Sequence, residues 1–88
     1  MTDTNTGYNG WKNRQTWNVA LWFGNDYGLY TRAKEARAQF IRMGWKSGFN
    51  AARAKALVTA AFQTGKTPDG DELVGVNWAE IASAFNKF

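Results

Sequence analysis

The side chains available for chemistry in this sequence are carboxylates, amines, guanidinium groups, hydroxyls and indoles, because the 88-residue chain contains no His and no Cys. Their absence excludes thiolate nucleophiles, Ser-His pairs, Cys/His zinc sites and disulfides. Glu80 is expected to cap a helix and Glu35 lies among basic residues, so neither carboxylate is paired with a second acidic group. Acid-base catalysis by carboxylates needs such a pair, in which the two groups have different pKa values. The sequence therefore predicts no catalytic residue, no metal and no cofactor.

Two short motifs resemble ligand-binding loops but lack the residues that such loops need. For QTGKT, at 63–67, a phosphate-binding loop would require Gly where Ala60 stands and a helix where Pro68 follows. DGDEL, at 69–73, contains three carboxylates but is too short for the alternating oxygen ligands of a calcium loop. A solvated acidic turn is the expected structure there.

The Lys and Arg residues are concentrated in the middle of the chain. Residues 27–66 contain eight of them against one Glu, a net charge of +7, whereas residues 67–88 contain four acidic residues against one Lys, a net charge of −3. A basic region of this kind is typical of nucleic-acid binding and also fits an acidic protein surface, although it can simply keep a small protein soluble. The predicted binding face consists of Arg32, Lys34, Arg37, Arg42, Trp45, Lys46, Arg53 and Lys55.

Hydrophobic periodicity and capping residues predict that helices position these side chains. The expected helices run from Arg14 to about Phe23, from Asp26 to about Gly44, from about Asn50 to Gln63, and from Asn77 onward. Asn13 and Asp26 are expected to cap the first two. The first is apolar around nearly its whole circumference, which predicts a buried, central helix with Trp17 and Trp22 in the core. The second has an apolar seam at alternating steps of four and three residues, formed by Leu29, Ala33, Ala36, Phe40 and Met43.

The last helix has the clearest start. Asn77 is expected to cap it, with Glu80 returning the hydrogen bond as in a capping box, and Val76 and Ile81 are placed for a hydrophobic staple. We expect an all-α fold with a single compact domain of about four helices at 10–88, preceded by a flexible polar tail at 1–9. No segment has the roughly 20 apolar residues of a membrane span, so no membrane partner and a cytoplasmic location are expected.

Two tryptophan-containing motifs, NGWKNRQTWNVALWFGND and VNWAEIA, resemble those of a family of small uncharacterised proteins of phages, cyanobacteria and haloarchaea. The residues that match the family pattern are Asn9, Gly10, Trp11, Asn13, Thr16, Trp17, Val19, Leu21, Trp22, Asn25 and Asp26, then Val76, Asn77, Trp78, Glu80, Ile81 and Ala82. The resemblance implies a phage or mobile-element setting and no established activity or cofactor. Relatives are often acidic between the motifs, where this chain is basic, so the resemblance does not imply nucleic-acid binding.

Both motifs start a helix with an Asn cap beside tryptophans, so we expect Trp11, Trp17 and Trp78 to meet and to hold the N-terminal segment against the last helix. The residues assigned to this structural signature are Trp11, Asn13, Trp17, Trp22, Asn77, Trp78 and Glu80.

Together these features predict a non-catalytic accessory binding module that contacts a protein partner through its basic helical face, in the host cytoplasm if the protein is phage-encoded. Two alternatives stay open, non-specific nucleic-acid binding through the same Lys and Arg residues and, more remotely, a small enzyme. A symmetric homodimer that buries some of the aromatic residues is a further option.

Overall fold

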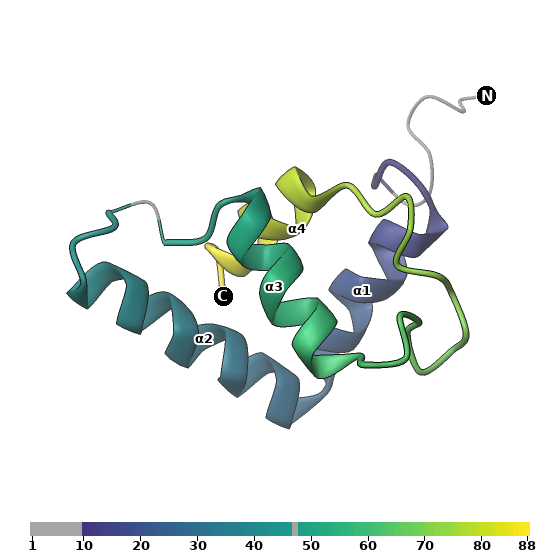
Figure 1. The fold of residues 1–88 in the computed structure, drawn as a ribbon, viewed down its shortest axis with the longest axis horizontal. Helices are drawn as coiled ribbons and strands as arrows, with labels where there is room; N and C mark the ends of the chain where they lie inside the picture. The colour runs from purple at the N-terminus through teal and green to yellow at the C-terminus, as the bar shows by residue number, and fades with distance from the viewer. Residues whose placement is uncertain (1–9, 47) are drawn as a thin grey trace.

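A computed structural model describes residues 10–46 and 48–88 and contains four α-helices in those ranges (Figure 1). They are α1 (Arg14–Asn25), α2 (Tyr27–Arg42), α3 (Ala51–Ala61) and α4 (Trp78–Phe85). The only extended pairing within the described part of the chain is an isolated bridge between Lys66 and Glu72. The predicted all-α fold is therefore confirmed, while the predicted tail at 1–9 lies outside the described residues.

Each helix starts after an Asn or Asp whose side-chain oxygen accepts a hydrogen bond from a first-turn amide, which satisfies a donor that has no partner within the helix. The capping residues are Asn13, Asp26, Asn50 and Asn77, with distances of 2.8–3.1 Å. The three predicted caps, Asn13, Asp26 and Asn77, are thus confirmed. Asp26 also ends α1, because its extended backbone (φ −91°, ψ 119°) separates α1 from α2 without a linker.

The central helix is α4 and not α1, which corrects the expected arrangement. α4 packs against α1, α2 and α3, whereas α1 packs mainly against α2 and α4. In Figure 1, α3 crosses in front of α4 while α2 runs along one side of the molecule. The short α4 contacts all three longer helices through one apolar side, which buries Ile81, Ala82 and Phe85. Its other side, with Ala79 and Ser83, is exposed.

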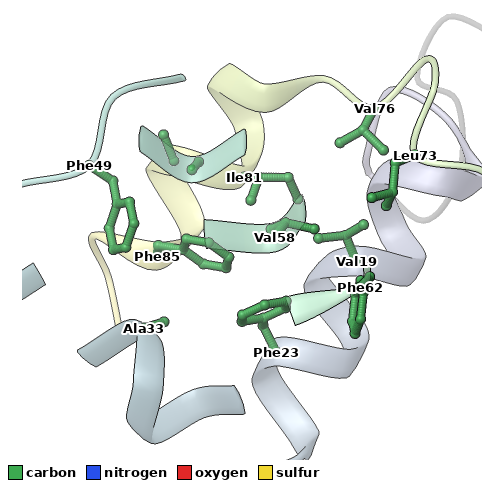
Figure 2. Packing of buried hydrophobic residues seen from close by; sticks show 12 residues of the cluster. Val19, Phe23, Ala33, Phe49, Val58, Phe62, Leu73, Val76, Ile81 and Phe85 are labelled. Carbon is green, nitrogen blue, oxygen red and sulfur yellow. The ribbon is translucent and has the colours of Figure 1, made fainter. Parts of the chain in front are cut away.

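Phenylalanine rings form the middle of the core (Figure 2). The Phe85 ring lies 4.9 Å from that of Phe23 and 5.0 Å from that of Phe49, measured between centroids, and Phe23 meets Phe62 edge-on at 5.6 Å. These tilted and edge-on geometries are the ones that aromatic quadrupoles favour. Because Phe23, Phe49, Phe62 and Phe85 come from α1, α4 and the segments flanking α3, the cluster joins distant parts of the chain.

The inward side of α1 differs from the prediction of an apolar helix buried all round. Thr16 and Asn18 are completely buried, Trp17 and Trp22 are only half-buried, and Leu21 is 36% exposed. The two polar residues face inward because each has hydrogen-bond partners in the segment that precedes α4. Met43 likewise departs from the predicted seam of α2, since it is 60% exposed.

Candidate functional site

The basic residues predicted to form one face point in several directions. On α3, Arg53 and Lys55 are two positions apart, which places them about 200° apart around the helix. Arg53 contacts Trp45, whereas Lys55 lines a hollow next to Trp78. Arg32 and Lys34 are separated by the same angle on α2, where the Lys34 Nζ lies 5.2 Å from the centre of the Tyr30 ring. The fold therefore does not gather these residues on a single continuous basic face.

The structure does bring three of the predicted residues together around the turn that links α2 to α3. The Arg53 guanidinium carbon lies 3.5 Å from the centroid of the Trp45 ring and 5.5 Å from that of Phe40. Arg53 Nη1 also makes a long 3.4 Å hydrogen bond to the Gly48 carbonyl oxygen. A guanidinium stacked on an indole combines cation–π attraction with a flat, partly apolar surface.

Arg37 completes this cluster from α2. Its side chain lies against Gly48, where an added Cβ would be 3.1 Å from Arg37 Cγ and 3.6 Å from Arg37 Nε. The Nε atom is buried and has no hydrogen-bond partner. Neither Arg37 nor Arg53 forms an ion pair within residues 10–46 and 48–88. We call the group of Arg37, Phe40, Trp45, Gly48 and Arg53 the Trp45 site.

Exposed apolar side chains lie beside the Trp45 site at the end of α2. Ile41 is 41% exposed, Met43 60% and Trp45 38%, and all three fall within five consecutive residues together with the exposed Arg42. Trp, Met and Arg are the residue types enriched at protein interfaces. This end of the molecule therefore combines unpaired positive charge with apolar area, and suits an acidic surface that also has apolar residues.

The structural signature holds the starts of α1 and α4 together through hydrogen bonds. Asn77 N donates to Thr16 Oγ1 (2.9 Å), and Thr16 Oγ1 donates to Asn13 Oδ1 (2.6 Å). Asn13 Nδ2 donates to the Gly75 carbonyl (2.7 Å). The predicted capping box is wrong in one half, because the Glu80 carboxylate accepts from Lys12 N at 2.9 Å while Asn77 N uses Thr16.

The tryptophans of the signature occupy separate places, in contrast to the predicted meeting of Trp11, Trp17 and Trp78. Trp11 lines a hollow beside α4 with Glu80, Trp78 lines another hollow beside α3, and Trp17 has the Arg14 guanidinium 5.8 Å from its ring centroid. Hydrogen bonds of Asn13, Thr16 and Glu80 thus join the N-terminal segment to α4 and the residues just before it. The sequence spacing does not identify Thr16 as a structural contact, because a Thr hydroxyl within a helix ordinarily contributes little to stability.

Replacing Thr16 with Val is expected to lower the free energy of unfolding by about 1–3 kcal/mol, because the Asn77 amide would lose its acceptor in a partly buried position. Urea unfolding would measure the loss. Thr16→Ser keeps the hydroxyl and should retain most of the stability, so equal losses in both variants would refute the assigned role of the hydroxyl.

The acidic turn expected to be merely solvated is bound to α1. Asp69 Oδ2 accepts hydrogen bonds from Asn18 Nδ2 (2.9 Å) and Trp22 Nε1 (3.0 Å), and Asp71 forms an ion pair with Arg14 at 2.9 Å. The turn itself is ordered by the buried Thr67, whose hydroxyl accepts from the Asp71 amide. These carboxylates therefore have structural partners roughly fifty residues away along the chain.

Hydrogen bonds from Asn18 and then Trp22 lower the pKa of Asp69 below its usual value of 3.8. They outweigh the opposing effect of burial, and the Arg14 charge also lowers the pKa. The unfolded chain therefore takes up the proton at a higher pH than the folded protein does. The stabilisation is present above the unfolded pKa and is lost as the pH falls through the folded pKa.

We therefore expect the urea midpoint of the wild type to fall as the pH is lowered below about 4, and part of this fall to be missing in Asp69→Asn. Unfolding measured at a series of pH values would show it. Glu72→Gln, a change of an exposed carboxylate in the same turn, is the control. Equal pH dependence in the Asp69 variant and the wild type would contradict the role given to Asp69.

No three Asp or Glu residues gather closely enough to hold a metal ion in the described part of the chain. Lys66, from the QTGKT motif, lies in the bridge with Glu72, and no helix follows it before α4. None of the helices in the described ranges is long and apolar enough to cross a membrane.

Residues 4–85 match a family of unknown function, DUF7249, which covers nearly the whole chain. The protein therefore belongs to that family. No curated protein and no solved structure matches the sequence. The motif-based resemblance to phage, cyanobacterial and haloarchaeal proteins stays a prediction.

Proposed function

We propose that this protein is a non-catalytic binding module that docks an acidic segment of a partner protein, containing apolar residues as well, on the Trp45 site and the adjoining end of α2. The observation that supports this most is a pair of arginines without any ion pair in the described residues, one of them stacked at 3.5 Å on a tryptophan that is 38% exposed.

Energetics favours an anionic partner at this position. The Arg37 Nε atom is buried without a hydrogen bond, and a cation that is partly removed from water without an anion is unfavourable. A carboxylate bound beside Arg37 and Arg53 would supply the missing negative charge with bidentate geometry. The exposed side chains of Met43 and Ile41 would add apolar contact area around it.

Nucleic-acid binding is the weaker candidate on this geometry. A protein that follows a phosphate backbone needs cations along a continuous track. Arg32 and Lys34 instead lie about 200° apart around α2, and Lys55 lines a hollow on another side of α3 from Arg53.

The enzyme alternative has still less support. Asp26 and Asp69 do line a common hollow, but both carboxylates make structural hydrogen bonds. Asp26 caps α2, and Asp69 accepts from Asn18 and Trp22. A phage-encoded accessory protein acting in the host cytoplasm is the setting that fits a small adaptor of this kind.

The test is a calorimetric titration with a short peptide that alternates Glu and Leu, repeated across a salt series, and a parallel titration with oligo-dT. We expect the acidic peptide to bind. The Trp45→Ala substitution should weaken the affinity roughly thirtyfold, the equivalent of about 2 kcal/mol. Arg53→Gln should weaken it about tenfold. Thermal unfolding of both variants would verify that they stay folded.

Arg32→Gln is the matched control, because it removes the same charge from an exposed position elsewhere on α2. It should leave the affinity nearly unchanged. Equal weakening by the Arg32 and Arg53 variants would mean that only net charge matters. Tighter binding of oligo-dT than of the acidic peptide would overturn the proposal in favour of nucleic acid.

A further inference from the structure

A hollow of about 410 Å³ lies between α3, the loop that precedes α4, and the start of α4. It is separate from the Trp45 site, since the two α3 residues that line it, Lys55 and Thr59, lie one turn apart on another side of the helix from Arg53. Its volume falls within the roughly 300–1,000 Å³ range of small-molecule pockets.

The lining is mostly apolar. The loop contributes Leu73, whose side chain is buried in the core, and Val74, which is 79% exposed, and α4 contributes the half-buried indole of Trp78. An isopropyl group left that exposed beside an indole is unfavourable in water and would be covered by an apolar ligand. Gly65 and Gly75 complete the wall without side chains, and an added Cβ at Gly65 would meet no atom within 4 Å.

Lys55 provides the positive charge in this lining. Its side chain is exposed and forms no ion pair in residues 10–46 and 48–88. Thr59 lies one turn further along α3, and its hydroxyl donates to the Lys55 carbonyl at 2.8 Å, which leaves the hydroxyl oxygen able to accept. The polar groups therefore lie on the α3 side of the hollow, while the indole and Val74 lie on the side of the loop and α4.

From this juxtaposition we infer that the hollow is a second binding site, specific for an apolar group that bears a carboxylate. The apolar part lies against Trp78 and Val74, and the carboxylate pairs with the Lys55 ammonium. Such a group occurs both in a small aromatic acid and at the C-terminus of a peptide that ends in Phe. The inference is independent of the Trp45 site.

The experiment is an NMR titration of the isotope-labelled full chain with hydrocinnamate, monitored at the Trp78 indole N–H and the Thr59 amide. The neutral amide hydrocinnamide is the matched probe. We expect hydrocinnamate to shift both signals and hydrocinnamide to bind about tenfold more weakly. Lys55→Met should reduce the affinity for hydrocinnamate to that of the amide, whereas Lys46→Met, at an exposed lysine outside the hollow, should leave it unchanged.

A second arm compares a short peptide that ends in a free Phe carboxylate with the same peptide amidated. Stronger binding of the free peptide than of hydrocinnamate identifies a chain end as the ligand, and stronger binding of hydrocinnamate identifies a small acid. Either result supports the site. Equal affinity for acid and amide, no shift at Trp78, or an unchanged affinity in Lys55→Met would overturn it.

Discussion

Replacing Phe85 with Ala is expected to lower the free energy of unfolding by about 3–5 kcal/mol. The ring is completely buried and lies against Phe23, Phe49 and Phe88. Its removal therefore reduces the buried apolar area and leaves a cavity that the packed helices cannot fill. For a chain of this size, such a loss is comparable with the whole stability. Chemical denaturation at neutral pH would measure it.

Tyr27→Ala is the control for Phe85→Ala, because it removes an aromatic ring that is 82% exposed. It should change the free energy of unfolding by less than about 0.5 kcal/mol. A small effect of Phe85→Ala would contradict the central position given to α4.

Replacing Gly48 with Ala is expected to cost roughly 2–4 kcal/mol, the second-largest effect. Gly48 has φ +74°, a left-handed conformation that disfavours any Cβ, and the new methyl carbon would lie only 2.7 Å from Asn86 Oδ1. That oxygen accepts from the Phe49 amide while Asn86 Nδ2 donates to the Phe49 carbonyl, both at 2.9 Å. The substitution would therefore disturb the connection between the α2–α3 turn and the end of α4.

The Gly44→Ala variant separates the cost of the left-handed backbone from the cost of the close contact with Asn86. Gly44 also has a left-handed backbone, with φ +95°, but a Cβ there would meet nothing within 4 Å. Its loss should be about 1–2 kcal/mol, the cost of the backbone conformation alone. Thermal unfolding of the two variants would compare them, and an equal loss in both would show that the contact with Asn86 is unimportant.

Local patterns were sufficient to predict the helices, because the information for a helix start lies within a few residues. Asn13, Asp26 and Asn77 were identified as caps from their own side chains and the apolar residues that follow. Helix ends were predicted less well, since Gly24 lies inside α1 and the Asp26 backbone decides where that helix stops. The burial of Thr16 and Asn18 also escaped prediction, because their partners, Asn77 and Asp69, are more than fifty residues away.

The candidate site was predicted only in part for the same reason. Composition identified the basic middle of the chain, but the direction of each side chain depends on how α2 and α3 pack on α4. Arg37, Trp45 and Arg53 come together around a glycine that no charge pattern could single out. Lys55 instead lines a hollow together with Trp78, a residue that the motifs assigned to structure.

The most direct test of the proposed docking site is to follow the indole N–H signals of the five tryptophans while the acidic peptide of alternating Glu and Leu is added. We predict that the Trp45 signal shifts most, that salt reduces the shift, and that Arg53→Gln abolishes most of it while Arg32→Gln does not. An unmoved Trp45 signal, or a largest shift at Trp11, Trp17, Trp22 or Trp78, would contradict docking at the Trp45 site.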